Sequence, residues 1–68
     1  MNKYIVAYIS FFDHVLLQAE IEAASDFEAA IKYLAMYQDI TDIEEVSDLD
    51  SLVSLCFNWD STISVYKI

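Results

Sequence analysis

The densest group of chemically active side chains is the acidic segment, which we define as residues 39–50. It carries six carboxylates in twelve residues and no basic side chain. The six are Asp39, Asp42, Glu44, Glu45, Asp48 and Asp50. Carboxylates at this density can bind a cation, act as acid and base in hydrolysis, or present a negative field to a basic partner.

Cation binding and hydrolysis fit this segment poorly. A calcium loop of the EF-hand type needs a central glycine and a set order of ligands, and the chain contains no glycine. Glu44 and Glu45 resemble the acids of glycosidases only in type, because a chain of 68 residues has little room for a sugar cleft. One histidine and one cysteine do not make a zinc site. We therefore predict no metal site and no cofactor.

The other reactive side chains, His14 and Cys56, are predicted to be structural. Cys56 lies in an apolar run with no base nearby in sequence, which is typical of a buried thiol. His14 follows Asp13, and both residue types tolerate the positive φ of a tight turn. A chain without glycine also has no glycine loop to cradle a phosphate. We predict no catalytic residue and no enzymatic activity.

The charge balance points to the kind of partner. Twelve acids against three lysines give a net charge of −9. Such a field repels nucleic-acid phosphates and anionic lipid, so we expect neither direct nucleic-acid binding nor membrane binding. It favours a protein with a basic surface, such as a nucleic-acid-binding site. The competing interpretation is that the acidity only keeps a chain that is 57% hydrophobic in solution.

The elements that would position these acids begin with a hairpin. Residues 3–12 and 15–24 are predicted strands, joined by a two-residue turn at Asp13 and His14 that pairs Phe12 with Val15 and Tyr8 with Ala19. The predicted core face holds Tyr4, Val6, Tyr8 and Phe12 from the first strand and Val15, Leu17, Ala19, Ile21 and Ala23 from the second. The opposite, mixed face holds Ile5, Ile9, Phe11, Leu16, Gln18, Glu20 and Glu22. A register change of one residue would exchange the faces of the first strand.

A capped helix follows the hairpin. Ser25-Asp26-Phe27-Glu28 forms a capping box, and the helix is predicted to end near Tyr37. Its inward residues are predicted to be Phe27, Ala30, Ile31, Leu34 and Tyr37, with Tyr33 and Met36 on the outer side.

The acidic segment and the residues after it complete the domain. Ile40, Ile43, Val46 and Leu49 recur through the segment and are expected to hold it against the core. Thr41–Glu44 and Ser47–Asp50 both resemble helix starts. A second helix from near Ser47 to Phe57 is predicted, with a strand at 51–57 as the open alternative. A turn at 58–61 and a closing strand at 62–67 beside the first strand follow.

These elements predict one α+β domain, residues 1–68, of order β-β-α-(α)-β, with a small antiparallel sheet and its helices on one face. A single cysteine excludes an internal disulfide, and the apolar run near the amino terminus is too short for a signal peptide or a membrane span. We expect a cytoplasmic protein. Because so small a core hides apolar surface poorly, a homodimer or another partner is expected to cover part of it.

Residues 22–32, Glu-Ala-Ala-Ser-Asp-Phe-Glu-Ala-Ala-Ile-Lys, carry a resemblance to known proteins. With the hairpin before them they resemble short bacteriophage proteins in which a hairpin runs into a capped, alanine-rich helix and a last strand. The resemblance implies a phage-encoded accessory protein in the host cytoplasm, such as an inhibitor of host defence or of a host nucleic-acid enzyme. Anti-CRISPR and anti-restriction proteins belong to this class, which shares no common site residues.

The predicted function is therefore recognition. The six carboxylates of the acidic segment, aided by Glu20 and Glu22, would present a nucleic-acid-like field to a basic site on a host protein, since duplex DNA carries one negative charge per about 1.7 Å of axis. The alternative is a structural or regulatory homo-oligomer that pairs through the apolar residues of the hairpin.

Overall fold

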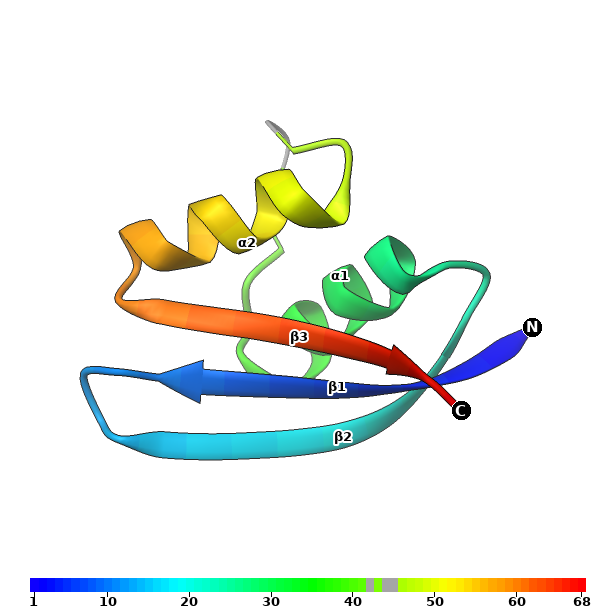
Figure 1. Ribbon diagram of the computed structural model, residues 1–68, viewed down its shortest axis with the longest axis horizontal. Coiled ribbons are helices and arrows are strands. Elements are labelled where there is room, and N and C mark those ends of the chain that lie inside the picture. The colour runs from blue at the N-terminus through cyan, green and yellow to red at the C-terminus, as the bar shows by residue number, and fades with distance from the viewer. Residues whose placement is uncertain (42, 44–45) are drawn as a thin grey trace.

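The computed structural model of the chain describes residues 1–41, 43 and 46–68. It contains, in chain order, β1 (Asn2–Ser10), β2 (Val15–Ala23), α1 (Asp26–Tyr37), α2 (Leu49–Asn58) and β3 (Ser61–Lys67) (Figure 1). The three strands form one antiparallel sheet, and both helices lie on the same face of it. The predicted α+β fold and element order are confirmed, and residues 51–57 are helical.

The strand order is β2-β1-β3, so β1 is central and pairs on both sides. The closing strand lies beside the first strand, as predicted, with Tyr8 opposite Ile63 and Val6 opposite Val65. The predicted pairing of β1 with β2 is wrong by two positions, because Tyr8 lies opposite Leu17 and Ser10 lies opposite Val15. An error of two leaves every side chain on its predicted face, since strand side chains alternate with a period of two.

The hairpin turn explains this difference. It holds four residues, 11–14, because the backbone N–H of Phe11 donates to the carbonyl of Asp60 at 2.8 Å and leaves the β1–β2 ladder. The Phe11 ring also stacks on Phe57, with 6.2 Å between ring centroids. His14 closes the turn at a φ of 56°. Phe12 is consequently a turn residue that is 82% exposed, and its predicted place in the core is wrong.

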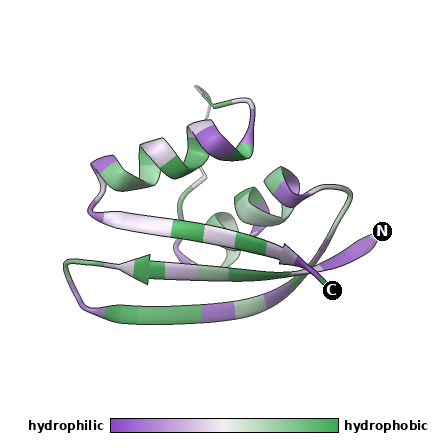
Figure 2. Ribbon diagram, viewed as in Figure 1, coloured by the Kyte–Doolittle hydropathy of each residue, from purple (hydrophilic) through white to green (hydrophobic). Residues whose placement is uncertain are grey.

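The core lies between the helices and one face of the sheet. The strands contribute Tyr4, Val6, Tyr8, Ile21, Ala23 and Ile63, and the helices contribute Ala29, Ala30, Tyr33, Leu34, Leu52 and Cys56. Alternating exposure along β1 and β2 shows that the other sheet face is open. Figure 2 shows apolar residues interspersed along the helices and strands and a continuous apolar stretch in the hairpin half of β2.

Helix α1 is rotated about its axis relative to the prediction. Tyr33, predicted to point outward, is 1% exposed, whereas Tyr37, predicted to be inward, is largely exposed. Ala29 is buried beside Ala30, and these two small side chains let the helix approach the sheet closely. The Tyr33 ring then fits against Tyr8, with centroids 5.9 Å apart. The phenol oxygen of Tyr33 accepts a hydrogen bond from the amide nitrogen of Gln38 at 3.4 Å.

Two predicted core residues of the hairpin are also exposed. Val15 and Leu17 point to the helix side of the sheet but are 40% and 42% exposed. In Figure 1, α1 lies over the opposite end of the hairpin, where Ile21 and Ala23 are buried. Within the part of the chain that the structure describes, no helix therefore covers the hairpin end of β2.

The chain makes its sharp bends without glycine. His14, Asp39 and Asp60 adopt positive φ values of 56°, 54° and 56°. Histidine and aspartate tolerate this region better than bulky or β-branched residues. Among the described residues, no helix is long and apolar enough to cross a membrane.

Candidate acidic interface

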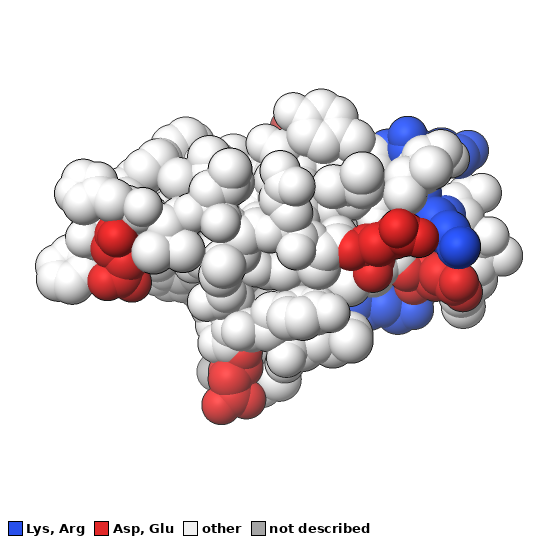
Figure 3. Space-filling view, turned by 90° about the horizontal axis from the view of Figure 1, so that it is seen from below, with Lys and Arg blue, Asp and Glu red and all other residues white. Residues whose placement is uncertain are grey.

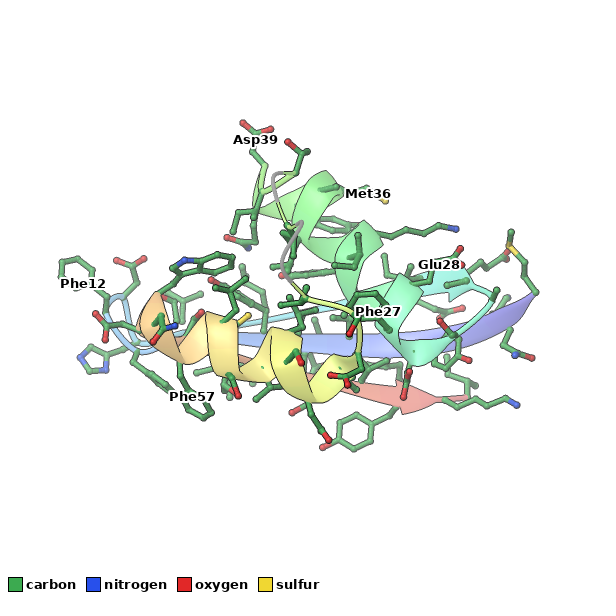
Figure 4. All side chains as sticks on the ribbon, turned by 90° about the horizontal axis from the view of Figure 1, so that it is seen from above. Phe12, Phe27, Glu28, Met36, Asp39 and Phe57 are labelled. Carbon is green, nitrogen blue, oxygen red and sulfur yellow. The ribbon has the colours of Figure 1, made fainter. Side chains whose placement is uncertain are left out.

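The acidic segment begins at the end of α1, where Asp39 reverses the chain. Gln38 caps the helix, and its backbone N–H donates to the carbonyl of Leu34 at 3.1 Å. The positive φ of Asp39 turns Ile40 back, so that the N–H of Ile40 reaches the same carbonyl at 3.0 Å. The carboxylate of Asp39 is left exposed, and Figure 4 shows it projecting from the end of α1.

The apolar residues of the acidic segment hold it to the domain, as predicted. Ile40, Ile43, Val46 and Leu49 are partly buried and pack against the core cluster. Partial burial of these four side chains attaches the described part of the segment to the core. Asp42, Glu44 and Glu45 lie outside the described residues.

The segment ends in the first turn of α2. Asp48, not Ser47, is the N-cap, and its Oδ1 accepts the backbone N–H of Ser51 at 2.8 Å. This backbone hydrogen bond, with a second from the Ser51 side chain, lowers the pKa of Asp48 below its ordinary value. Asp50 lies two residues further on, in the first turn of α2, and is exposed. Asp48 thus stabilises the helix start as well as carrying charge, while Asp39 and Asp50 are unpaired acids of the described segment that face solvent.

Glu20 and Glu22 lie apart from the acidic segment. Their neighbours in β2, Ile21 and Ala23, are buried under the helices, so Glu20 and Glu22 point to the open sheet face. Glu20 also forms an ion pair with Lys3, with 3.6 Å between nitrogen and oxygen. The structure therefore does not bring these two glutamates together with the segment on the helix side.

The open sheet face has a distinct charge pattern of its own. Figure 3 shows a broad uncharged middle, with the lysines and several acids at one end and further acids at the other end and at the lower margin. Ile5, Ile9, Leu16 and Tyr66 are exposed large apolar residues of this face. The mixed face that the hairpin pattern predicts is thus present, and it differs in character from the acidic segment.

The neighbourhood of the α2 start could not be found from sequence spacing. The first turns of α1 and α2 lie side by side in Figures 1 and 4, and each first turn carries acids, Asp26 and Glu28 in α1 and Asp50 in α2. Glu28 is paired with Lys32 at 3.3 Å, whereas the carboxylate of Asp26 accepts the N–H of Phe27 at 2.6 Å. The two helix caps in the sequence predict two acidic helix starts, but they do not predict that these two starts lie next to each other.

The two reactive side chains outside the segment have structural surroundings. Cys56 is buried, and burial raises the pKa of its thiol, opposed by a hydrogen bond from Ser61. The hydroxyl of Ser61 donates to the carbonyl of Cys56 at 3.0 Å and ties α2 to β3. His14 lies in the exposed hairpin turn. Within the described ranges, no three His, Cys, Asp or Glu side chains are grouped to hold a metal ion.

The described part of the acidic segment and the open sheet face are thus two separate surfaces, one with the exposed carboxylates of Asp39 and Asp50 and the other with exposed apolar side chains. No protein family, curated protein or solved structure matches the chain.

Proposed function

We propose that this protein is a non-enzymatic binding protein whose acidic segment occupies a basic, nucleic-acid-binding site on another protein. The observation that carries the proposal is the packing of Ile40, Ile43, Val46 and Leu49 against the core. A charge run on a free tail would lose conformational entropy on binding, whereas a segment already held in place loses less. The described carboxylates at its two ends, Asp39, Asp48 and Asp50, therefore lie next to backbone that is packed against the core.

The charge arrangement supports the same proposal. Two of the three lysines pair with Glu20 and Glu28, which lie outside the acidic segment. Among the described residues, neither of these lysines pairs with an acid of the segment, which favours neutralisation of its field by a partner. The longest dimension of the molecule, 32 Å, equals about nine nucleotide steps of roughly 3.4 Å each, which limits the length of site that it can fill.

The resemblance of the hairpin and residues 22–32 to short bacteriophage proteins suggests the class of partner. In this proposal the protein is phage-encoded and acts in the host cytoplasm, and its target is a host defence protein or a nucleic-acid-processing protein. Binding alone blocks the target, because the acids fill the place of phosphates and no bond is made or broken.

The test is capture of partners from bacterial lysate at rising salt. The immobilised protein is challenged with the heparin-binding fraction of the lysate, which enriches proteins that bind polyanions. Between about 0.1 M and 1 M salt the screening length falls from about 10 Å to about 3 Å, so capture should fall steeply. Capture that is indifferent to salt, or no captured protein, contradicts the proposal.

Matched variants locate the effect. Asp39→Asn with Asp50→Asn removes two charges from the segment, and Asp13→Asn with Asp60→Asn removes two from the hairpin end. Asparagine tolerates the positive φ that Asp39 and Asp60 require. Capture should weaken with the first pair and stay near wild type with the second. Equal loss with both pairs would mean that only net charge matters, which contradicts a defined site.

Adding Asp42→Asn, Glu44→Gln and Glu45→Gln to the first pair should abolish capture. Asp48 is left unchanged in this series, because removing its carboxylate also removes the cap of α2. Circular dichroism of each variant establishes that the fold is retained.

A further inference from the structure

The outer strand β2 carries a surface that the acidic segment does not explain. Strand order β2-β1-β3 leaves one edge of β2 without a strand beside it in the described chain. Three consecutive large apolar residues stand at its hairpin end, Val15, Leu16 and Leu17, exposed by 40%, 58% and 42%. Because strand side chains alternate, these residues are exposed on both faces of the sheet.

This edge lacks the features with which proteins guard free strands. A free edge is usually shielded by proline, by lysine, by a bulge or by a covering helix. The β2 sequence, VLLQAEIEA, has neither proline nor lysine, and its two acids lie in the half away from the hairpin turn. In Figures 1 and 4, α2 runs along β3, and α1 lies over the other end of β2. The apolar half of β2 is therefore open for strand pairing.

We infer that this half of β2 pairs with the same half of β2 from a second copy of the chain. The two strands run antiparallel about a twofold axis at Leu17 and join two three-stranded sheets into one of six strands. Val15 then lies opposite Ala19 of the second copy, Leu16 opposite Gln18, and Leu17 opposite Leu17. This dimer does not rest on the proposed function, because it uses neither the acidic segment nor a basic partner.

Charge selects the register of this self-pairing. With the axis at Leu17, the two copies of Glu20 stand six positions apart, about 20 Å, and lie outside the paired segment. With the axis at Ala19, which would pair all nine residues, the same glutamates are diagonal neighbours about 7–8 Å apart and repel each other. An axis at Glu20 would place them directly opposite. A chain of net charge −9 can thus pair with itself along this edge only through its uncharged half.

The paired segment is short, so the dimer is weak and depends on concentration. It runs from Val15 to Ala19, with the exposed Phe12 of each turn at its ends. Such a ladder buries less than the roughly 800 Å² per partner of a typical stable interface. The expected behaviour is a reversible monomer–dimer equilibrium.

The test joins cross-linking to hydrodynamics. In Leu17→Cys the two introduced thiols lie directly opposite, with Cβ atoms about 4.5–5.5 Å apart, a separation that a disulfide can nearly span. In Ala19→Cys they stand four positions apart, about 13 Å, and cannot be joined. Cys56 is buried in both variants and does not compete while the protein is folded. Mild oxidation should therefore link Leu17→Cys chains far faster than Ala19→Cys chains.

Sedimentation of the unmodified protein up to roughly millimolar concentration should show the dimer. Leu16→Lys should abolish it, although the added positive charge lowers the general repulsion between copies. Met36→Lys, at an exposed position on α1, is the matched control and should leave the dimer intact. The inference is overturned if Ala19→Cys chains link faster, if both variants link equally, or if the protein is a monomer at every concentration. A monomer at every concentration would leave this edge to pair with a strand of another protein.

Discussion

Replacement of Tyr33 tests how α1 is seated on the sheet. Simple helical spacing places Tyr37 inward and Tyr33 outward, whereas the structure buries Tyr33 and exposes Tyr37. Because the two tyrosines lie one turn apart on the same helix, Tyr33→Ala and Tyr37→Ala are chemically identical changes in opposite surroundings. Their relative cost in unfolding free energy reports which of the two side chains α1 buries against the sheet.

The expected magnitudes differ by a wide margin. Deleting a buried aromatic side chain costs about 3–5 kcal/mol, and Tyr33 also loses its ring contact with Tyr8. Tyr37 keeps only its stacking on Tyr33, with 5.1 Å between centroids, which is worth about 0.5–1.5 kcal/mol. A chain of 68 residues has about 3–10 kcal/mol of stability in total, at roughly 0.05–0.15 kcal/mol per residue. Tyr33→Ala should therefore be close to unfolded at room temperature.

The assay is urea unfolding followed by circular dichroism and by the fluorescence of Trp59. Tyr33→Leu keeps apolar volume and provides a measurable midpoint if Tyr33→Ala does not fold. Tyr33→Phe removes only the hydroxyl that accepts from Gln38 and should cost about 1 kcal/mol or less. If Tyr37→Ala proves more costly than Tyr33→Ala, the burial of Tyr33 in the described core is wrong.

Three further changes test the helix caps and the buried thiol. Ser25→Ala should lower stability by about 0.5–2 kcal/mol, because the Ser25 hydroxyl accepts the N–H of Glu28 at 3.2 Å. Ser25→Asp should retain the cap, and thermal melts compare the two variants. Because the pKa of Asp48 is lowered, its carboxylate contributes stability above pH 3.8, and this contribution is lost as pH falls through the folded-state pKa. The free energy of unfolding should therefore fall less with acid in Asp48→Asn than in the unmodified protein. Because the pKa of Cys56 is raised, its thiol contributes stability below pH 9.0, and this contribution is lost as pH rises from there to the folded-state pKa. Alkaline destabilisation should therefore be smaller in Cys56→Ala, and an unchanged pH profile would refute the role of the thiol.

The features that sequence predicted correctly are those that neighbouring residues determine. The Ser25 cap needs only a hydroxyl and the amide three residues on, and His14 needs only a residue type that accepts positive φ. The alternation of β2 placed Ile21 and Ala23 inside and Glu20 and Glu22 outside in any even register. The recurrence of apolar residues through the acidic segment predicted its attachment to the core.

The features that sequence could not predict depend on contacts between distant residues. Phe11 leaves β1 because it bonds to Asp60 and stacks on Phe57, and neither partner is visible from the hairpin sequence. The orientation of α1 on the sheet depends on the contact between the ring of Tyr33 in the helix and the ring of Tyr8 in β1. The separation of Glu20 and Glu22 from the acidic segment follows from which face the helices cover.

The most direct test of the proposed function is competition with nucleic acid. A partner captured by the immobilised protein is titrated with an oligonucleotide that this partner binds, at fixed low salt. If the acidic segment fills the nucleic-acid site, the oligonucleotide releases the partner in proportion to its own affinity, and Asp39→Asn with Asp50→Asn lowers the concentration required. A ternary complex of protein, partner and oligonucleotide, or release that these substitutions do not alter, would contradict it.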